Sequence, residues 1–141
     1  MRAAALLLLA IGPAFGDSPA SRHGIVPDFK SFPQASPKEA LGSVLKAAEL
    51  KRVDYLLAQL ADPDETDARA AVLDGGFKEA VKDAGEKLDA AALKKLKRFL
   101  QEGEFETLET RAVVRLKDAP GRVVRLRKIG VRWYLLNPSK P

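Results

Sequence analysis

The chain contains 141 residues, enough for one domain. Hydrophobic residues make up 46% of it and charged residues 30%, which is ordinary for a soluble globular protein. A formal net charge of +5 is too small by itself to indicate nucleic-acid binding, and we expect no nucleic-acid partner. The chain has no cysteine and one histidine, which excludes disulfides and thiolate metal sites, and we predict no metal and no cofactor.

The N-terminus has the three-part pattern of a secretory signal peptide over residues 1–16. Met1 and Arg2 precede an apolar run from Ala3 to Ile11, and small residues then lead to a cleavage site before Asp17. The run is too short for a permanent anchor, and no second one follows. We therefore predict an exported protein, periplasmic or extracellular, with no transmembrane segment after signal removal. The lack of cysteine is compatible with a bacterial exported protein.

Residues 17–35 contain three prolines among serine, glycine and isolated apolar residues. This composition predicts either a linker or a strap that lies on the domain. The only histidine, His23, falls in this segment and is a poor candidate for a ligand or a catalytic base. The remainder, residues 36–137, is predicted to form a single α+β domain.

Helices are predicted for the first half of that domain. Ser36 and Glu39 form a capping-box pair at the start of the first helix. The apolar stripe that follows changes to a different side of the helix partway along. This change predicts a break near residues 49–51 and two helical pieces.

Two amphipathic helices are predicted before the strands begin, after a short helix at residues 66–73. The first has an apolar stripe from Phe77 to Leu88, and the second starts at Asp89 and is stopped by Gly103. Its basic residues, Lys95 among them, are assigned to the solvent face.

Period-two alternation from Phe105 to Pro138 predicts an antiparallel meander of at least three strands. Helices followed by such strands give an α+β fold, with N-terminal helices packed on a C-terminal curled sheet. A loop at residues 119–121 would pair Val114 with Leu126, and a turn at residues 129–130 would pair Leu126 with Trp133.

This register gathers basic side chains on the other face of the sheet. It places Arg115 opposite Arg125 and Arg127 opposite Arg132, with Tyr134 beside Arg125. Like charges in such positions destabilise a sheet by up to about 1 kcal/mol per pair. We take these five residues as candidates for binding an acidic protein, a polymer or an anion, because arginine favours forked recognition of carboxylate, phosphate or sulfate. The alternative is a solubilising face, or one neutralised by Glu104, Glu106 or Glu109.

Three segments of the chain follow one another in a definite order. They are the capped helix from Ser36 to Leu41, the segment Leu50 to Leu57 and the closing segment Val123 to Leu135. That order resembles the nuclear transport factor 2-like superfamily of cone-shaped α+β domains, especially its small exported bacterial members of unknown function. The resemblance covers residues 36–136. It implies a cone, with Tyr55 and Trp133 as candidates for its wall, in a superfamily that includes isomerases, dehydratases, polyketide cyclases and members without activity. The simpler interpretation places Trp133 in the core and makes Tyr55 a half-buried aromatic residue.

These observations leave three functional hypotheses. The favoured one is a non-catalytic exported domain that binds an acidic partner or anionic ligand through the arginine-rich face. The alternative is a small-molecule carrier, or an isomerase- or cyclase-like enzyme, that uses the cone interior. A third is an oligomerising module such as a homodimer. No catalytic residue is assigned, because the predicted inward positions of the last two strands carry no acid and the folded region has no histidine.

Overall fold

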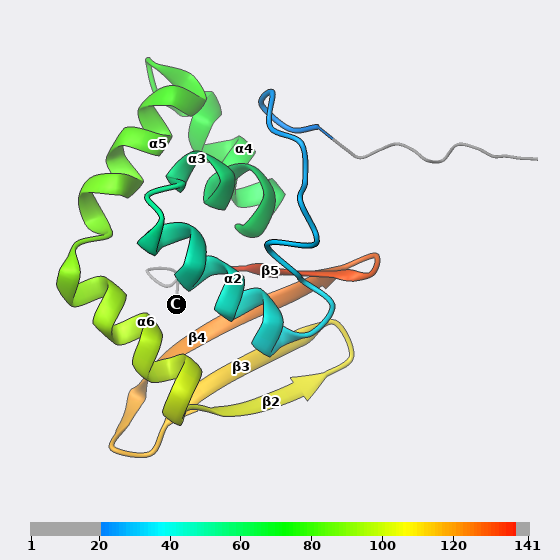
Figure 1. The fold of residues 1–141 in the computed structure, drawn as a ribbon, viewed down its shortest axis with the longest axis vertical. Coiled ribbons are helices and arrows are strands. Elements are labelled where there is room, and N and C mark those ends of the chain that lie inside the picture. Colours follow the sequence, from blue (N-terminus) through cyan, green and yellow to red (C-terminus); the bar gives the residue numbers. More distant parts are fainter. Residues whose placement is uncertain (1–20, 138–141) are drawn as a thin grey trace, which may run out of the picture.

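The computed structural model describes residues 21–137, so the predicted signal peptide lies outside the described residues. It confirms the α+β class, with helices packed against one antiparallel sheet (Figure 1). The helical elements are α2 (Pro37–Glu49), α3 (Val53–Tyr55), the π-helical turn η2 (Leu56–Leu60), α4 (Pro63–Val72), α5 (Gly76–Lys87) and α6 (Ala90–Glu102). The strands are β2 (Glu104–Leu108), β3 (Arg111–Leu116), β4 (Ala119–Ile129) and β5 (Arg132–Leu135), in the order β2-β3-β4-β5. Within the described part of the chain, none of the helices is long and apolar enough to cross a membrane.

The start of α2 and the break after it are both as the sequence predicts. The Ser36 hydroxyl accepts a hydrogen bond from the Glu39 N–H at 3.1 Å, and the Glu39 carboxylate accepts one from the Ala35 N–H at 3.0 Å. The helix ends at Glu49, and Lys51 then takes a positive φ of 60° before α3 begins. Because Lys51 has a left-handed backbone conformation, the chain forms two separate helical pieces here.

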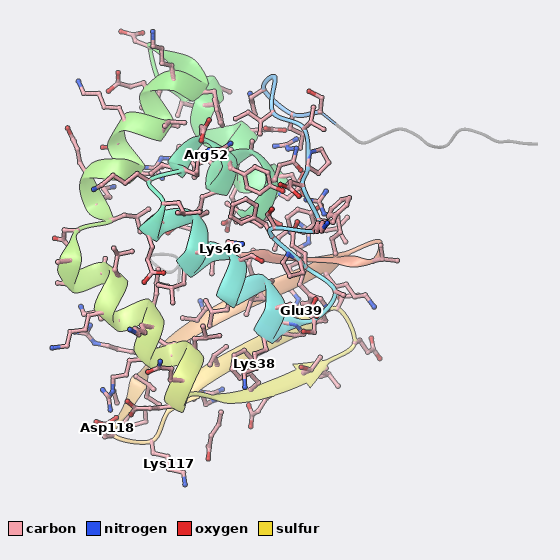
Figure 2. All side chains as sticks on the ribbon, viewed as in Figure 1. Lys38, Glu39, Lys46, Arg52, Lys117 and Asp118 are labelled. Atoms are coloured by element: carbon pink, nitrogen blue, oxygen red, sulfur yellow. The ribbon has the colours of Figure 1, made fainter. Side chains whose placement is uncertain are left out.

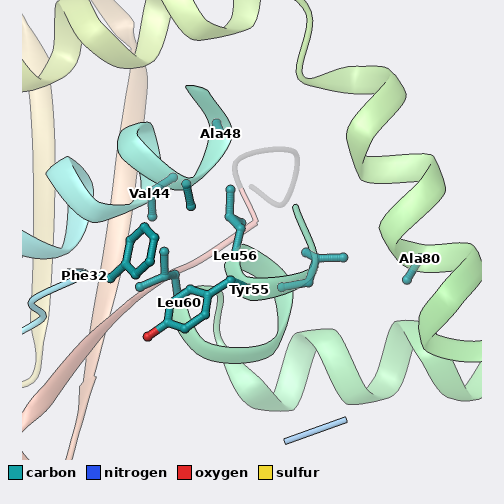
Figure 3. Packing of buried hydrophobic residues seen from close by; sticks show 9 residues of the cluster. Phe32, Val44, Ala48, Tyr55, Leu56, Leu60 and Ala80 are labelled. Atoms are coloured by element: carbon teal, nitrogen blue, oxygen red, sulfur yellow. The ribbon is translucent and has the colours of Figure 1, made fainter. Parts of the chain in front are cut away.

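The apolar side chains form two neighbouring cores. The first joins residues 21–35, α2, α3, η2 and α5, and Figure 3 shows Tyr55 and Phe32 in it, with Ala80 on α5. The Phe32 and Tyr55 rings stack with their centroids 4.4 Å apart. The second joins α2 and α6 to the inner face of the sheet, around Leu41, Phe99 and Trp133. The inward set of the sheet therefore agrees with the predicted alternation, because Ala112, Val114, Leu116, Val124 and Leu126 are all buried.

The predicted register between β4 and β5, in which Leu126 pairs with Trp133, is wrong by two residues. Leu126 pairs with Leu135, and Ile129 pairs with Arg132, so Gly130 and Val131 form the turn. Gly130 has a φ of 63°, and a two-residue hairpin favours glycine at the first central position. The turn is therefore set by Gly130, whereas the prediction put Ile129 there. Val131 lies at the tip of the hairpin and is largely exposed.

The predicted register between β3 and β4 is also wrong. Val114 pairs with Val124, and Leu116 pairs with Ala119 across a short turn, with a register shift between these pairs. Residues 120–122 form the bulge, so Pro120 and Gly121 do not make the turn that their sequence suggests. Proline has no N–H for a ladder and glycine tolerates irregular backbone, so both residues are also suited to a bulge.

Residues 21–35, the described part of the segment predicted to be a linker or a strap, pack on the domain and are called the strap below. The Arg22 side chain donates to the Ala58 carbonyl at 2.9 Å near its start. Near its end, the Gln34 carbonyl accepts from the Trp133 N–H, also at 2.9 Å. The strap thereby covers one edge of the sheet at β5, and Asp62 extends the cover by donating its N–H to the Leu135 carbonyl.

Candidate functional site

The sheet brings all four predicted arginines to its outer face but does not oppose them as predicted. Arg115 lies opposite Val123, and Arg125 lies opposite Val113. Arg127 lies opposite Arg111 on one side and Tyr134 on the other. The like-charge pair that does occur, Arg111 with Arg127, was not predicted.

Two of these arginines are paired with acids of the same molecule. Arg127 reaches across the β5 edge and lies 3.0 Å from a carboxylate oxygen of Asp62 and 3.0 Å from one of Asp64. The hydrogen bonds to Asp64 and Asp62 raise the pKa of Arg127. Arg115 lies 3.4 Å from Glu106, one of the glutamates that the sequence offered as neutralising partners. This part of the predicted binding face therefore has internal counter-charges.

Arg132 is a half-buried structural cation beneath the strap. Its guanidinium donates to the Gln34 Oε1 at 3.1 and 2.6 Å and to the Gln59 carbonyl at 2.9 Å. It lies over the Phe29 ring at 4.8 Å and over the Tyr134 ring at 4.9 Å. Burial lowers the pKa of Arg132. These contacts tie the strap to β5 and η2.

The aromatic residues predicted to line a cone are packed in the two cores. Tyr55 is 2% exposed, and its hydroxyl accepts a hydrogen bond from the Asp28 N–H at 2.7 Å. Burial raises the pKa of Tyr55. Trp133 is buried against the inner face of the sheet, and Tyr134 is buried on the opposite side of β5.

A large hollow lies elsewhere, between the arch of α5 and α6 and the first half of β4. It is an open groove of about 1370 Å³. In Figure 1 the arch stands to the left of α2, with β4 below it, and Figure 2 places Asp118 at the β3–β4 turn beneath α6. A smaller cavity of about 120 Å³ beside η2 and α4 shares four lining residues with it: Leu56, Arg69, Leu135 and Asn137.

The floor of the groove is apolar because α5 and α6 do not bury their stripes. Each helix has a single fully buried residue, Ala80 on α5 and Phe99 on α6. Ala84, Leu88 and Leu96 remain half-buried and line the groove. Amphipathic helices normally cover such a stripe with a neighbouring element.

The rim of the groove is cationic. Six basic residues line it, and the described lining has no carboxylate: Arg69, Lys87, Lys95, Arg98, Arg122 and, at the β4 edge, Arg125. Asp83 pairs with Arg69 and Lys87, while Asp118 and Glu102 pair with Arg98. Within residues 21–137, neither Lys95 nor Arg122 lies within ion-pair distance of an acid.

The sequence contained part of this signal. It gave the apolar stripe of α5 and α6 and the basic residues beside it, but a stripe does not reveal whether another element covers it. Arg125 is the one predicted binding residue that lines the groove. No cluster of potential metal ligands occurs among the described residues.

No family model, curated protein or solved structure matches the chain. The resemblance to the nuclear transport factor 2-like superfamily therefore stays a prediction from sequence.

Proposed function

We propose that this protein is a non-catalytic binding domain that holds an acidic ligand with an apolar part in the groove between the α5–α6 arch and β4. The observation that carries the proposal is the half-buried apolar stripe beneath a basic rim, in which Lys95 and Arg122 have no acid within ion-pair distance among the described residues. Apolar surface gains about 25 cal/mol per Å² when a ligand removes it from water. The cations would attract the acidic part of the same ligand.

The groove suits this role better than the outer face of the sheet. On the outer face, Arg127 and Arg115 already have carboxylate partners. Arg132 is engaged by neutral oxygens beneath the strap. At the groove, Lys95 and Arg122 face solvent beside uncovered leucine side chains. Binding there would join charge attraction to apolar burial, which sites for organic ligands commonly combine.

A fluorescent dye tests the proposal directly. Anilinonaphthalene sulfonate combines an apolar ring system with one negative charge, and we expect it to bind the folded protein. The variant Lys95→Glu should weaken the dye about fivefold, since one exposed charge contact contributes about 1 kcal/mol. Lys94→Glu is the matched control, because Lys94 is exposed on the same helix and does not line the groove. Equal loss in both variants, or no binding, would contradict the proposal.

We further propose that the domain acts outside the cytoplasm, on the basis of the signal-peptide pattern in residues 1–16. Expression of the full chain followed by cell fractionation and mass measurement tests this. We expect the exported fraction to contain a chain that begins at Asp17. An intact N-terminus in the cytoplasmic fraction would contradict it.

A further inference from the structure

Among the described residues, the first half of β4 is a strand edge without a partner on its β5 side, beside the groove. β5 pairs with β4 only from Leu126 to Ile129. The last hydrogen bond between them runs from the Leu136 N–H to the Arg125 carbonyl at 2.9 Å. Beyond it, the described residues place no strand next to Ala119–Val124 on this side.

Val123 supplies the next backbone groups along this edge. Peptide groups alternate sides along an antiparallel strand. Because the Arg125 carbonyl faces β5, the Val123 N–H and carbonyl face the same side. Residues 121–124 line the groove, and Gly121 and Arg122 are exposed. The edge is thus accessible from the groove.

The sequence itself disfavours a continuation of β5 along this edge. In the β4–β5 register, the residue that would donate to the Val123 carbonyl is residue 138, which is proline. Proline has no N–H and cannot make that bond.

We propose that the groove binds a polypeptide partner: an extended, acidic segment that adds as a strand beside Ala119–Val124. This inference rests on the proposed function and names the partner of the same site. Strand addition uses backbone hydrogen bonds for affinity and alternate side chains for selectivity. Alternate side chains of the added strand would enter the apolar groove near Leu96, while its acids would meet Lys95 and Arg122.

The bulge at residues 120–122 limits how far the added strand can pair. Backbone pairing is therefore centred on Val123, and apolar burial and charge must supply the rest of the affinity. This division leads to a test in which each contribution is removed separately.

The probe is a short end-blocked peptide that alternates valine and glutamate, titrated into the protein after removal of the signal peptide. We expect saturable binding in calorimetry and slowed exchange of the Val123 amide proton in NMR. A peptide that alternates valine and lysine should bind at least about fivefold more weakly, because it faces a cationic rim.

Backbone pairing is tested from both sides of the contact. The valine–glutamate peptide with alternate amides N-methylated keeps its charge and loses donors, and we expect about fivefold weaker binding. Val123→Pro should have a similar effect, since its N–H points away from β3 and proline is tolerated at such an edge position. The methylated peptide keeps the test valid even if that variant does not fold.

The outcomes separate this inference from the proposed function. If methylation does not matter, or if Val123 is unaffected by saturating peptide, strand addition is refuted. If, in addition, dye binding is weakened by Lys95→Glu and not by Lys94→Glu, the groove binds acidic ligands of another kind and the proposed function stands. If neither dye nor peptide binds, both fail. Dimerisation that blocks the peptide would show that a second copy occupies the edge, and would overturn the inference.

Discussion

Replacing Arg132 with leucine is expected to destabilise the fold, although Arg132 was predicted from sequence to be part of an exposed binding face. Both donors that the structure gives to the Gln34 Oε1 belong to Arg132, and Gln34 is 3% exposed. A buried acceptor that loses its partners costs about 2 kcal/mol. Loss of the guanidinium between the Phe29 and Tyr134 rings adds about 1 kcal/mol.

The expected total is about 3 kcal/mol, which lowers the melting temperature of a domain of this size by about 12 °C. Denaturant unfolding followed by circular dichroism measures it. Arg111→Leu is the matched control, because Arg111 is an exposed arginine on the outer face, and we expect a change within about 0.5 kcal/mol. If Arg132→Leu unfolds at the same denaturant concentration as the unaltered protein, Arg132 is not the structural cation described above.

Three further predictions concern single contacts. Ser36→Ala should cost about 1 kcal/mol in denaturant unfolding, because the Glu39 N–H loses its cap; an unchanged midpoint would show that the cap contributes nothing. Gly103→Ala should lower the free energy of unfolding by about 2 kcal/mol in the same assay. The added Cβ would lie 2.3 Å from the Phe99 carbonyl oxygen and 2.5 Å from Val114 Cγ1. A variant as stable as the unaltered protein would mean that the end of α6 shifts without cost. The Arg22 hydrogen bond lowers the pKa of Asp67, so the stability from this contact is complete above the unfolded-state pKa of about 3.9 and is lost as pH falls through the folded-state value. Strap cleavage by an acid-active protease should therefore rise at low pH and rise less in Asp67→Asn, which lacks the charge at every pH; equal pH dependence in both proteins would contradict the assignment.

The parts of the fold that follow from local chemistry could be predicted from the sequence. The cap at Ser36, the break at residues 49–51 and the inward alternation around Val114 all depend on neighbours in the chain, and each prediction is confirmed. The register could not be predicted, because Pro120 and Gly121 suit a turn and a bulge equally well. Gly103 shows the same limit: it follows α6 as predicted, but its φ is −70°, and it is needed there for close packing against Phe99.

The candidate site was less predictable because it depends on what remains uncovered. The fate of the arginines was decided by distant partners, such as Asp62 for Arg127 and Gln34 for Arg132, that local pattern does not link. The leucine stripe of α5 and α6 was visible, but only the packed structure shows Leu88 and Leu96 facing a groove.

Methyl NMR of leucine and valine side chains tests the central claim most directly, because both faces of the sheet carry such groups. The protein is titrated with anilinonaphthalene sulfonate. We predict chemical-shift changes at Leu88, Leu96 and Val124, which line the groove, and none at Val113 and the exposed Leu108 on the outer face. Shifts confined to Val113 and Leu108 would contradict the account and return the binding site to the outer face of the sheet.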